Sequence, residues 1–274
     1  MKGWLLEVDA FLQSLSNHIT KQEIGQDAYC WYLPEIELYI VGVSINSQIL
    51  IGDVKFLGNQ QNRIVLWQDM WHSKPAVVKS RLKAMARQNM TIPARLTKVR
   101  RIDKYMLDTF LKANHLNTLT TAKFKYGLFL PKHYYRILKD DIPTSEEWLV
   151  AVASFSGGKK IERSGSIYRS YELIRFCNVL NYTVVGGLDK LLKAFIADQN
   201  PDDVMTYADR DWSNGASYEK LGFERVGETL PQKFYINIHT LERSYEPPLN
   251  VSFKEIYNTG NWKYLLKLKK TMQL

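Results

Sequence analysis

Cysteine, glycine and proline are all scarce in this chain. It has 2 cysteines, 15 glycines and 9 prolines among 274 residues. Two cysteines are too few for a disulfide framework or a spaced metal-binding box, so Cys30 and Cys177 are expected to be reduced, buried thiols of a cytoplasmic protein. The low glycine and proline content argues against long disordered segments. The sequence therefore predicts well-folded domains.

Long apolar runs and a secretion signal are also lacking. The opening residues, MKGWLLEVDAFL, have one lysine and then an acidic interruption, and they lack the apolar core of a signal peptide. No run approaches the roughly 20 apolar residues of a membrane-spanning helix, so no membrane partner is expected. Acidic residues are outnumbered, which gives a net charge of +9. That balance fits either a polyanionic partner such as DNA or simple solubility.

The chain length is comfortable for two domains, since single domains usually have roughly 100–200 residues. Residues 1–93 are expected to form a small α+β domain, with a helix over 4–19, an antiparallel meander over 29–66 and a helix over 74–85 that begins near Pro75. Residues 94–274 alternate between strands and helices. They predict a mixed, mostly antiparallel α/β sheet with a parallel portion and flanking helices.

The most basic stretch lies between residues 79 and 104, where nearly every charge is positive. Such a run between two modules is typical of a surface that contacts the phosphates of DNA. It is equally typical of a solvated helix face followed by a linker, and the sequence leaves both interpretations open. The candidate nucleic-acid-binding residues are Lys79, Arg81, Lys83, Arg100 and Arg101.

A glycine pair marks a turn between a strand and a helix in the second domain. The segment YELIRFCNVLNYTVVGGLDKLLKAFI is expected to form a strand, a short loop with Gly186 and Gly187, and an amphipathic helix. Glycines at such a turn expose backbone N–H groups at the positive end of the helix dipole, which suits a phosphate. The alternative is that they only let the helix pack close to a strand.

The residues that follow favour the phosphate-binding interpretation. After one more strand, DVMTYADR, the chain reads ASYEKLGFERVGE, and the sequence Tyr-Glu-Lys-Leu-Gly-Phe resembles the signature of GNAT acetyltransferases. The resemblance covers roughly residues 97–239 and implies a GNAT-like domain that transfers an acyl group from acetyl-CoA to an amine. The cofactor-binding residues that it implies are Val185, Gly186, Gly187, Lys190 and Asn214.

The resemblance also implies catalytic residues. Tyr218 matches the tyrosine placed near the thioester sulfur and is the candidate acid, whereas Glu172 or Asp209 is the candidate base. Asp209 ends a strand beside a crossover, where ligand clefts of α/β sheets form. Structural alternatives remain open: Tyr218 packs in a helix, Glu172 pairs with a neighbouring arginine, and Asp209 caps the helix that begins near Ser213.

A narrower resemblance concerns the substrate. The segments NHL, KYGLF, YELIRFC, VVGG, SYEKLGF and IYNTGNWKYLL are similar to the C-terminal part of phage and mobile-element proteins described as homing-endonuclease-like, and YELIRF with TYAD looks like the Mom DNA-modification proteins. This resemblance implies an acceptor associated with nucleic acid. Residues 1–93 then become a nuclease-like remnant or DNA-contacting module. A metal-dependent nuclease would have to use Asp53, Lys55 and Asp69, whose spacing is irregular.

The glycine turn departs from the GNAT pattern at three positions. Thr183 replaces a basic or amide residue, Leu188 occupies a small position, and Asp189 places a negative charge at a helix N-terminus, where it repels a pyrophosphate. Two functions therefore stay open. One is an acetyl-CoA-dependent N-acyltransferase that acts on an unidentified amine, for which a nucleobase is one candidate. The other is a catalytically silent DNA-binding protein of phage or mobile-element origin.

Overall fold

The computed structural model describes residues 3–47, 62–117, 121–139, 142–163 and 165–268. They form two compact units, each made of three segments of the chain. Unit 1 comprises residues 1–86, 208–217 and 226–263, and unit 2 comprises residues 87–207, 218–225 and 264–274. The domain boundary predicted at residue 93 lies near residue 86, where the first segment of unit 1 ends. Within the described ranges, no helix is both long and apolar enough to cross a membrane.

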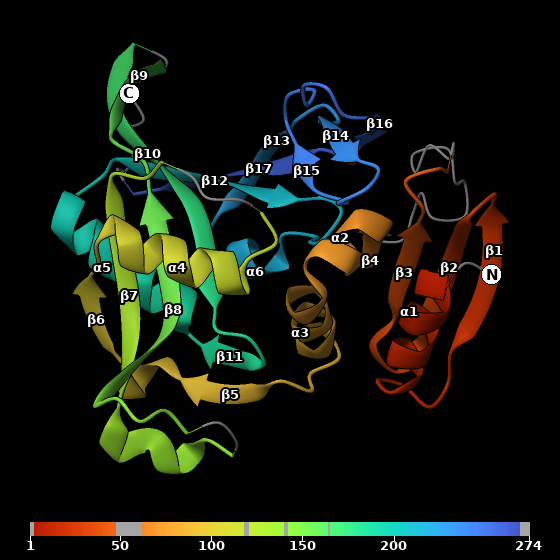
Figure 1. Ribbon diagram of the computed structural model, residues 1–274. Helices are drawn as coiled ribbons and strands as arrows, with labels where there is room; N and C mark the ends of the chain where they lie inside the picture. Colours follow the sequence, from red (N-terminus) through yellow and green to blue (C-terminus); the bar gives the residue numbers. More distant parts are fainter. Residues whose placement is uncertain (1–2, 48–61, 118–120, 140–141, 164, 269–274) are drawn as a thin grey trace. The chain divides into compact units, whose positions relative to one another are not determined.

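Unit 1 contains two small sheets and the helices that pack with them (Figure 1). The first sheet has the strand order β1-β2-β3-β4, and the second has the order β15-β14-β16. Its helices and strands are α1 (Gly3–Gln13), β1 (Thr20–Gly25), β2 (Ala28–Leu33), β3 (Leu38–Val43), β4 (Arg63–Trp67), α2 (Gln68–Ser73), α3 (Pro75–Met85), β14 (Lys233–Asn237), β15 (Arg243–Ser244) and β16 (Phe253–Tyr257).

The core of unit 1 is held by indole groups that are buried and hydrogen-bonded at the same time. Trp31 on β2 donates to Asp9 Oδ1 of α1 at 2.8 Å, and Trp71 on α2 donates to Glu7 Oε2 of α1 at 3.0 Å. Both tryptophans are almost fully buried, so these bonds satisfy N–H groups that would otherwise be costly to bury. The bonds fix the amphipathic helix α1 against the remainder of the unit.

The first sheet differs from its prediction in one respect. The strands β2 and β3 pair antiparallel, as expected, and β1, which precedes the predicted meander, pairs antiparallel with β2. The strands β3 and β4 instead pair parallel, with Tyr39 opposite Arg63 and Val43 opposite Trp67. A parallel pair requires a crossover connection, which alternation of apolar residues does not reveal. The predicted fully antiparallel meander is therefore wrong at this pair. The helix predicted over residues 74–85 is confirmed as α3, which begins at Pro75.

Unit 2 is built on a mixed sheet with the strand order β13-β17-β12-β10-β8-β7-β6, and β9 pairs with the outer part of β10. The elements that lie wholly within this unit are β5 (Met90–Pro93), β6 (Lys98–Arg101), α4 (Lys104–Asn114), β7 (Phe124–Pro131), β8 (Glu147–Phe155), β9 (Lys159–Arg163), β10 (Ser166–Asn178), β11 (Tyr182–Val185) and α5 (Gly187–Gln199). Four more elements continue from this unit into unit 1: β12 (Asp203–Asp209), α6 (Ala216–Glu219), β13 (Glu224–Glu228) and β17 (Asn261–Lys267).

Helices α4 and α5 cover opposite faces of this sheet (Figure 1). Phe195 of α5 stacks on Phe155 of β8, with ring centroids 3.8 Å apart. Leu107 and Leu111 of α4 instead pack in a cluster with Val152 of β8. Residues 152 and 155 point to opposite faces because side chains alternate along a strand. The mixed, mostly antiparallel α/β architecture predicted for this part of the chain is confirmed.

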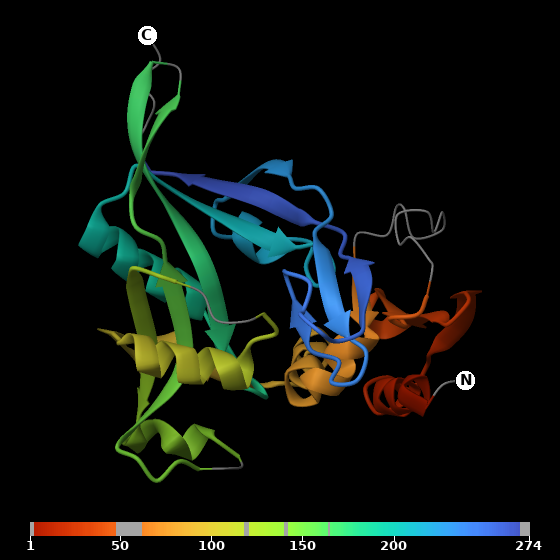
Figure 2. The same cartoon turned by 45° about the horizontal axis from the view of Figure 1, so that its top comes forward.

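Two smaller features of unit 2 differ from the expected order of elements. The segment before Gly186 is a strand, β11, which pairs parallel with β5, whereas a loop was expected there. The strand expected over residues 94–102 begins with a short 3-10 helix, and β6 itself covers only Lys98–Arg101. Beyond the sheet, β9 and the first half of β10 form a projecting hairpin (Figure 2).

Candidate functional site

The parallel strands β10 and β12 pair over a short length and then separate. Ser170 to Leu173 lie opposite Asp203 to Thr206, and no further pairs follow among the described residues, although β10 continues to Asn178. Figure 2 shows the two strands diverging from this paired end. Backbone N–H groups of β10 that face β12 beyond Leu173 therefore have no partner strand. Diverging strands at a crossover are a common position for a ligand.

A β-bulge lies at the point where the strands separate. In the antiparallel pair of β10 with β8, Leu173 lies opposite Phe155 and Arg175 lies opposite Ser154, so Ile174 is the extra residue. A bulge of this kind re-aims the side chains that follow it. Glu172 and Arg175 therefore point to the same face of the sheet, although they are three positions apart, a spacing that normally places side chains on opposite faces. This is the face that α4 covers.

Glu172 is half-buried on that face. Its backbone N–H donates to Ser156 Oγ at 2.9 Å. Burial raises the pKa of the Glu172 carboxyl above its usual value, and the nearby positive charges of Arg175 and Lys159 oppose the rise. Arg175 influences Glu172 through its charge, while its Nη1 donates a hydrogen bond to Ile174 O at 2.8 Å.

Tyr207 accompanies Glu172 and was not identified from the sequence. Glu172 lies opposite Met205, and Tyr207 follows two residues later on the same face of β12. Burial and then the charge of Glu172 raise the pKa of the Tyr207 phenol, which is still 37% exposed. The phenol therefore stays protonated at neutral pH beside a carboxylate. Alternation along β12 could have indicated Tyr207, since it shares a face with Asp209.

Tyr218 lies at the end of α6, in a compact turn of unit 2. Its ring packs against Phe223, with centroids 5.7 Å apart, and against Tyr264, with centroids 5.6 Å apart. The Tyr264 hydroxyl donates to Glu219 Oε1 at 3.1 Å, and burial raises the pKa of Tyr264 to about 12. Gly222 ends the turn with a φ of 85°, a backbone conformation that favours glycine after a helix.

Asp209, the last residue of β12, belongs to unit 1. Its Oδ1 accepts a hydrogen bond from the backbone N–H of Asp211 at 3.0 Å, so its carboxylate stabilises the turn that follows β12. Burial and the neighbouring charge of Asp211 raise the pKa of Asp209 to about 7, while Arg81 and Arg243 oppose the rise. The Asp209 carboxylate therefore caps a turn. The sequence offered capping of a helix as the alternative to a catalytic role for this residue.

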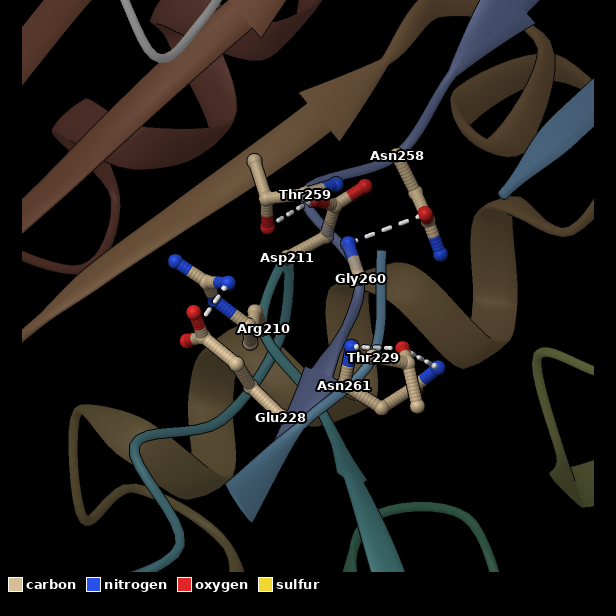
Figure 3. Close-up of polar contacts among 8 residues, drawn as sticks. All are labelled: Arg210, Asp211, Glu228, Thr229, Asn258, Thr259, Gly260 and Asn261. Atoms are coloured by element: carbon tan, nitrogen blue, oxygen red, sulfur yellow. Dashed lines mark hydrogen bonds and ion pairs between the residues drawn. The ribbon is translucent and has the colours of Figure 1, made fainter. Parts of the chain in front are cut away.

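Asp211, two residues further on, lies at the centre of a group of hydrogen bonds in unit 1 (Figure 3). It is 2% exposed and accepts hydrogen bonds from Trp67 Nε1 at 3.1 Å, from Thr259 N at 2.9 Å and from Thr259 Oγ1 at 2.7 Å. Asn258 Oδ1 accepts from Gly260 N at 3.0 Å in the same turn. These bonds fix the segment that leads into β17.

The predicted cofactor-binding residues fall into two groups. Val185, Gly186, Gly187 and Lys190 form the connection from β11 into α5 in unit 2, where Gly186 has a φ of 77° and no side chain caps the helix. The Lys190 ammonium donates hydrogen bonds to the carbonyl oxygens of Ala94 and Thr97, which directs it away from a ligand at the helix N-terminus. Asn214 lies in unit 1, and its Oδ1 accepts from Ala216 N at 3.2 Å.

The departure at Asp189 has a local explanation. Its carboxylate pairs with Lys193 at 2.7 Å, one turn further along α5, and both side chains reach solvent. The positive charge of Lys193 offsets part of the repulsion that Asp189 would exert on an anion at the helix N-terminus. Leu188 is half-buried, whereas Tyr182, at the start of β11, packs edge-on against Trp148.

The residues predicted to contact DNA are divided between the units. Lys79 lies over the rings of Phe11 and Trp71, and Arg81 lies over Trp212, all within unit 1. Lys83 is in the last turn of α3. In unit 2 the two arginines are paired with acids, Arg100 with Glu147 and Arg101 with Asp198. A DNA-contacting role stays a prediction.

No cluster of metal-ligating side chains is found in the described part of the chain. Asp53 and Lys55 lie outside the described residues. Asp69 is almost fully buried and accepts two hydrogen bonds from the Arg243 guanidinium, at 2.9 and 3.0 Å. Its carboxylate is therefore committed to a structural ion pair.

Comparison with known proteins gives structural resemblances only. No family model and no curated protein matches the sequence. Among similar solved structures are a NatC complex bound to Gag peptide and CoA (12% identity, TM-score 0.37, covering 63% of this chain and 99% of that one) and the ribosomal-protein-S18-alanine N-acetyltransferase from Escherichia coli (10%, 0.37, 64% and 96%). A third is Arabidopsis thaliana NAA60 in complex with acetyl-CoA (10%, 0.38, 63% and 99%). Values this low leave the function to be inferred from the geometry of this chain.

Proposed function

We propose that this protein is a GNAT-type N-acyltransferase, which uses acyl-CoA to acylate an amine. The observation that carries the proposal is the separation of β10 from β12 at a bulge, with Glu172 and its raised pKa on the strand just before it. A diverging parallel pair, a crossover helix that starts at a glycine and a basic carboxylate occur in the same unit. The sequence resemblance to GNAT proteins implies the same set of features.

The turn from β11 into α5 fits an anionic group such as a pyrophosphate. Gly186 and Gly187 bring the backbone to the first turn of a 13-residue helix, whose first N–H groups have no intrahelical partner. A side chain at Gly187 would approach Val184 to 3.0 Å, so the turn is built closely around glycine. The backbone N–H groups of Gly187, Leu188 and Asp189 would hold the pyrophosphate. Lys190 would not, because its ammonium is bonded to carbonyl oxygens.

When bound, acyl-CoA would supply a thioester whose acyl carbon bonds to the amine nitrogen as the carbon–sulfur bond breaks. Glu172 would accept the proton that the amine loses, since a raised pKa makes a carboxylate a better base at neutral pH. The unpaired backbone N–H groups of β10 beyond Leu173 would donate to the carbonyl oxygen as negative charge develops on it.

A tyrosine would return a proton to the leaving sulfur. Tyr218, which the sequence resemblance implies, and Tyr207, which lies beside Glu172, are the two candidates in unit 2. The Tyr207 phenol is protonated at neutral pH and partly exposed, which suits a proton donor. Asp209 is assigned a structural role in this proposal, because its carboxylate already stabilises the turn at Asp211.

Calorimetric titration with acetyl-CoA tests the proposal. We expect saturable binding, and no heat of binding at millimolar ligand would remove the proposal. Val185→Glu adds a charge beside the α5 N-terminus at a residue that is 57% exposed. It should weaken binding by about fivefold, since such a charge is worth about 1 kcal/mol there. Ile167→Glu is the matched control, because Ile167 is 62% exposed on the projecting hairpin, and it should leave affinity unchanged.

A further inference from the structure

Three polar side chains form a row across the sheet of unit 2, on the face of Glu172. Lys125 of β7 lies opposite Ser154 of β8, and Ser154 lies opposite Arg175 of β10. Directly paired residues have Cβ atoms about 4.5–5.5 Å apart, so the row spans about 10 Å. The bulge at Ile174 completes the row, because without it Arg175 would face α5.

The row contains hydrogen-bond donors with no acceptor. Ser154 is fully buried, and its hydroxyl has no partner among the described residues. The Nε of Arg175 is also buried and unsatisfied within that range, although its Nη1 donates to Ile174 O at 2.8 Å. Buried donors in folded proteins are nearly always satisfied, so such a pair at neighbouring positions needs a reason. An anion between the two side chains would satisfy both.

Charge on this part of the face also favours an anion. Lys125 and Arg175 flank the buried Ser154 on the neighbouring strands and are themselves half-buried, so each is partly accessible to solvent. Lys159, at the base of the hairpin, adds a third positive charge near Glu172. Donors that are charged form shorter and stronger hydrogen bonds to phosphate or carboxylate than neutral donors do.

We propose that the acceptor amine carries an anionic group, phosphate or carboxylate, which the Lys125, Ser154 and Arg175 row binds while the amine points toward Glu172. This inference rests on the proposed acyl transfer for the role of the amine. It names the substrate class of that same site. The anion supplies orientation, since its position on the sheet fixes the distance of the nitrogen from the Glu172 carboxylate.

Binding of three matched amines to the full chain tests the inference without acyl-CoA. The probes are O-phosphoethanolamine, β-alanine and ethanolamine, which carry a phosphate, a carboxylate and no anion, and calorimetry measures their dissociation constants. We expect at least one anionic amine to bind about tenfold more tightly than ethanolamine. A factor of this size is what a single charge-assisted hydrogen bond to the anion would contribute. The tighter of the two identifies the anion. Equal constants for all three probes would overturn the inference.

Ser154→Ala is the sharpest variant. It removes a buried hydroxyl that has no partner among the residues that the structure describes, so the melting temperature should stay the same or rise, whereas the preference for the anionic amine should fall about tenfold. Lys125→Gln should lower the same preference. Lys160→Gln is the control, because Lys160 lies opposite Arg169 on the other face of the hairpin, and it should leave the preference unchanged.

The possible outcomes separate the two proposals. If acetyl-CoA binds but Ser154→Ala and Lys160→Gln affect the amines equally, the anion site is wrong and the acyl-transfer proposal stands. If the anionic preference depends on Ser154 and Lys125 but acetyl-CoA does not bind, the anion site stands and the acyl transfer is wrong.

Discussion

Glu172 owes its chemistry to its position on β10. It lies beside Arg175 only because a bulge follows it, and burial raises its pKa in spite of two nearby positive charges. Because burial raises its pKa, this carboxylate is a stronger base than an exposed one. The residue type alone carries none of this information.

Glu172→Gln should lower kcat about 100-fold or more, because the amide cannot accept the proton of the amine. The dissociation constant for acetyl-CoA should not change. In the native protein the rate should rise with pH as the carboxyl, whose pKa is raised, loses its proton, and the variant should lack this acid limb. Steady-state kinetics over pH would measure both effects. Glu162→Gln, on the other face of the hairpin, is the control, and an unchanged kcat in Glu172→Gln would exclude the general-base role.

For Asp209 we predict an effect of pH on stability, since its pKa of about 7 in the folded state lies above its ordinary value. Between about pH 4 and pH 7 the native state binds more protons than the unfolded state, so the free energy of unfolding falls as pH rises and levels off above pH 7. Asp209→Asn keeps an oxygen for the Asp211 N–H but loses the charge. It should unfold with a higher free energy than the native protein at pH 8, by about 1.4 kcal/mol for each unit of the pKa shift, and with about the same free energy at pH 4.

Urea unfolding at the two pH values measures this difference. A variant that is less stable than the native protein at pH 8 would contradict the assignment. It would indicate that the ionised carboxylate, together with Arg81 and Arg243, contributes to the fold.

At the scale of elements, the turn before β17 depends on one glycine. Gly260 has a φ of 83°, and a Cβ there would lie 2.4 Å from the carbonyl oxygen of Thr229, a backbone atom that has little room to move (Figure 3). The positive φ alone costs an L residue roughly 1–2 kcal/mol.

Gly260→Ala should therefore lower the free energy of unfolding by at least about 2 kcal/mol, because strain at φ adds to displacement of the backbone. Gly227→Ala is the matched control. A Cβ at Gly227 meets nothing within 4 Å, so this substitution should change stability by less than about 0.5 kcal/mol. Denaturant unfolding compares the two, and equal effects would show that the turn adapts.

At the scale of the whole molecule, unit 1 is assembled from segments that are far apart in the sequence. The Arg243 guanidinium donates two hydrogen bonds to Asp69, which lies 174 positions earlier, and both side chains are largely buried. Arg243 also lies over the ring of Phe234. This pair connects the helix α2 with the three-stranded sheet of the same unit.

Arg243→Met should destabilise unit 1 by about 3–5 kcal/mol, because it leaves the Asp69 charge buried without a partner. Adding Asp69→Leu to it should recover much of the loss, which a double-mutant cycle by urea unfolding would show. Lys233→Met is the control, since it breaks a more exposed pair with Glu255 and should cost at most about 1 kcal/mol. A loss in Arg243→Met no larger than in this control would exclude a connecting role.

Much of the architecture could be predicted from periodicity and turn residues. The helices α3 and α5 and the strand β12 lie where the sequence predicts them, within a few residues, whereas α1 ends at Gln13, six residues before its predicted end. The parallel pairs of β3 with β4 and of β5 with β11 were missed, because pairing partners depend on the crossover and leave no alternating pattern of their own.

The site was predicted in part. Gly186 and Gly187 lie at the helix N-terminus as expected, and Glu172 lies at the end of the paired region. Lys190 was expected to contact the cofactor, but its ammonium is bonded to two carbonyl oxygens contributed by residues 94 and 97. Tyr207 was not predicted, and neither was the row of Lys125, Ser154 and Arg175.

The sequence alone determined the mixed α/β architecture and the glycine turn at the start of α5, since apolar periodicity and residues that tolerate positive φ act locally. Only the tertiary structure decided that Glu172 and Arg175 share a face and that residues 208–217 and 226–263 pack with the N-terminal part of the chain. The bulge depends on the register of β10 against β8, and the assembly of unit 1 depends on buried contacts between distant segments. Both are set by packing between elements, which a linear pattern does not record.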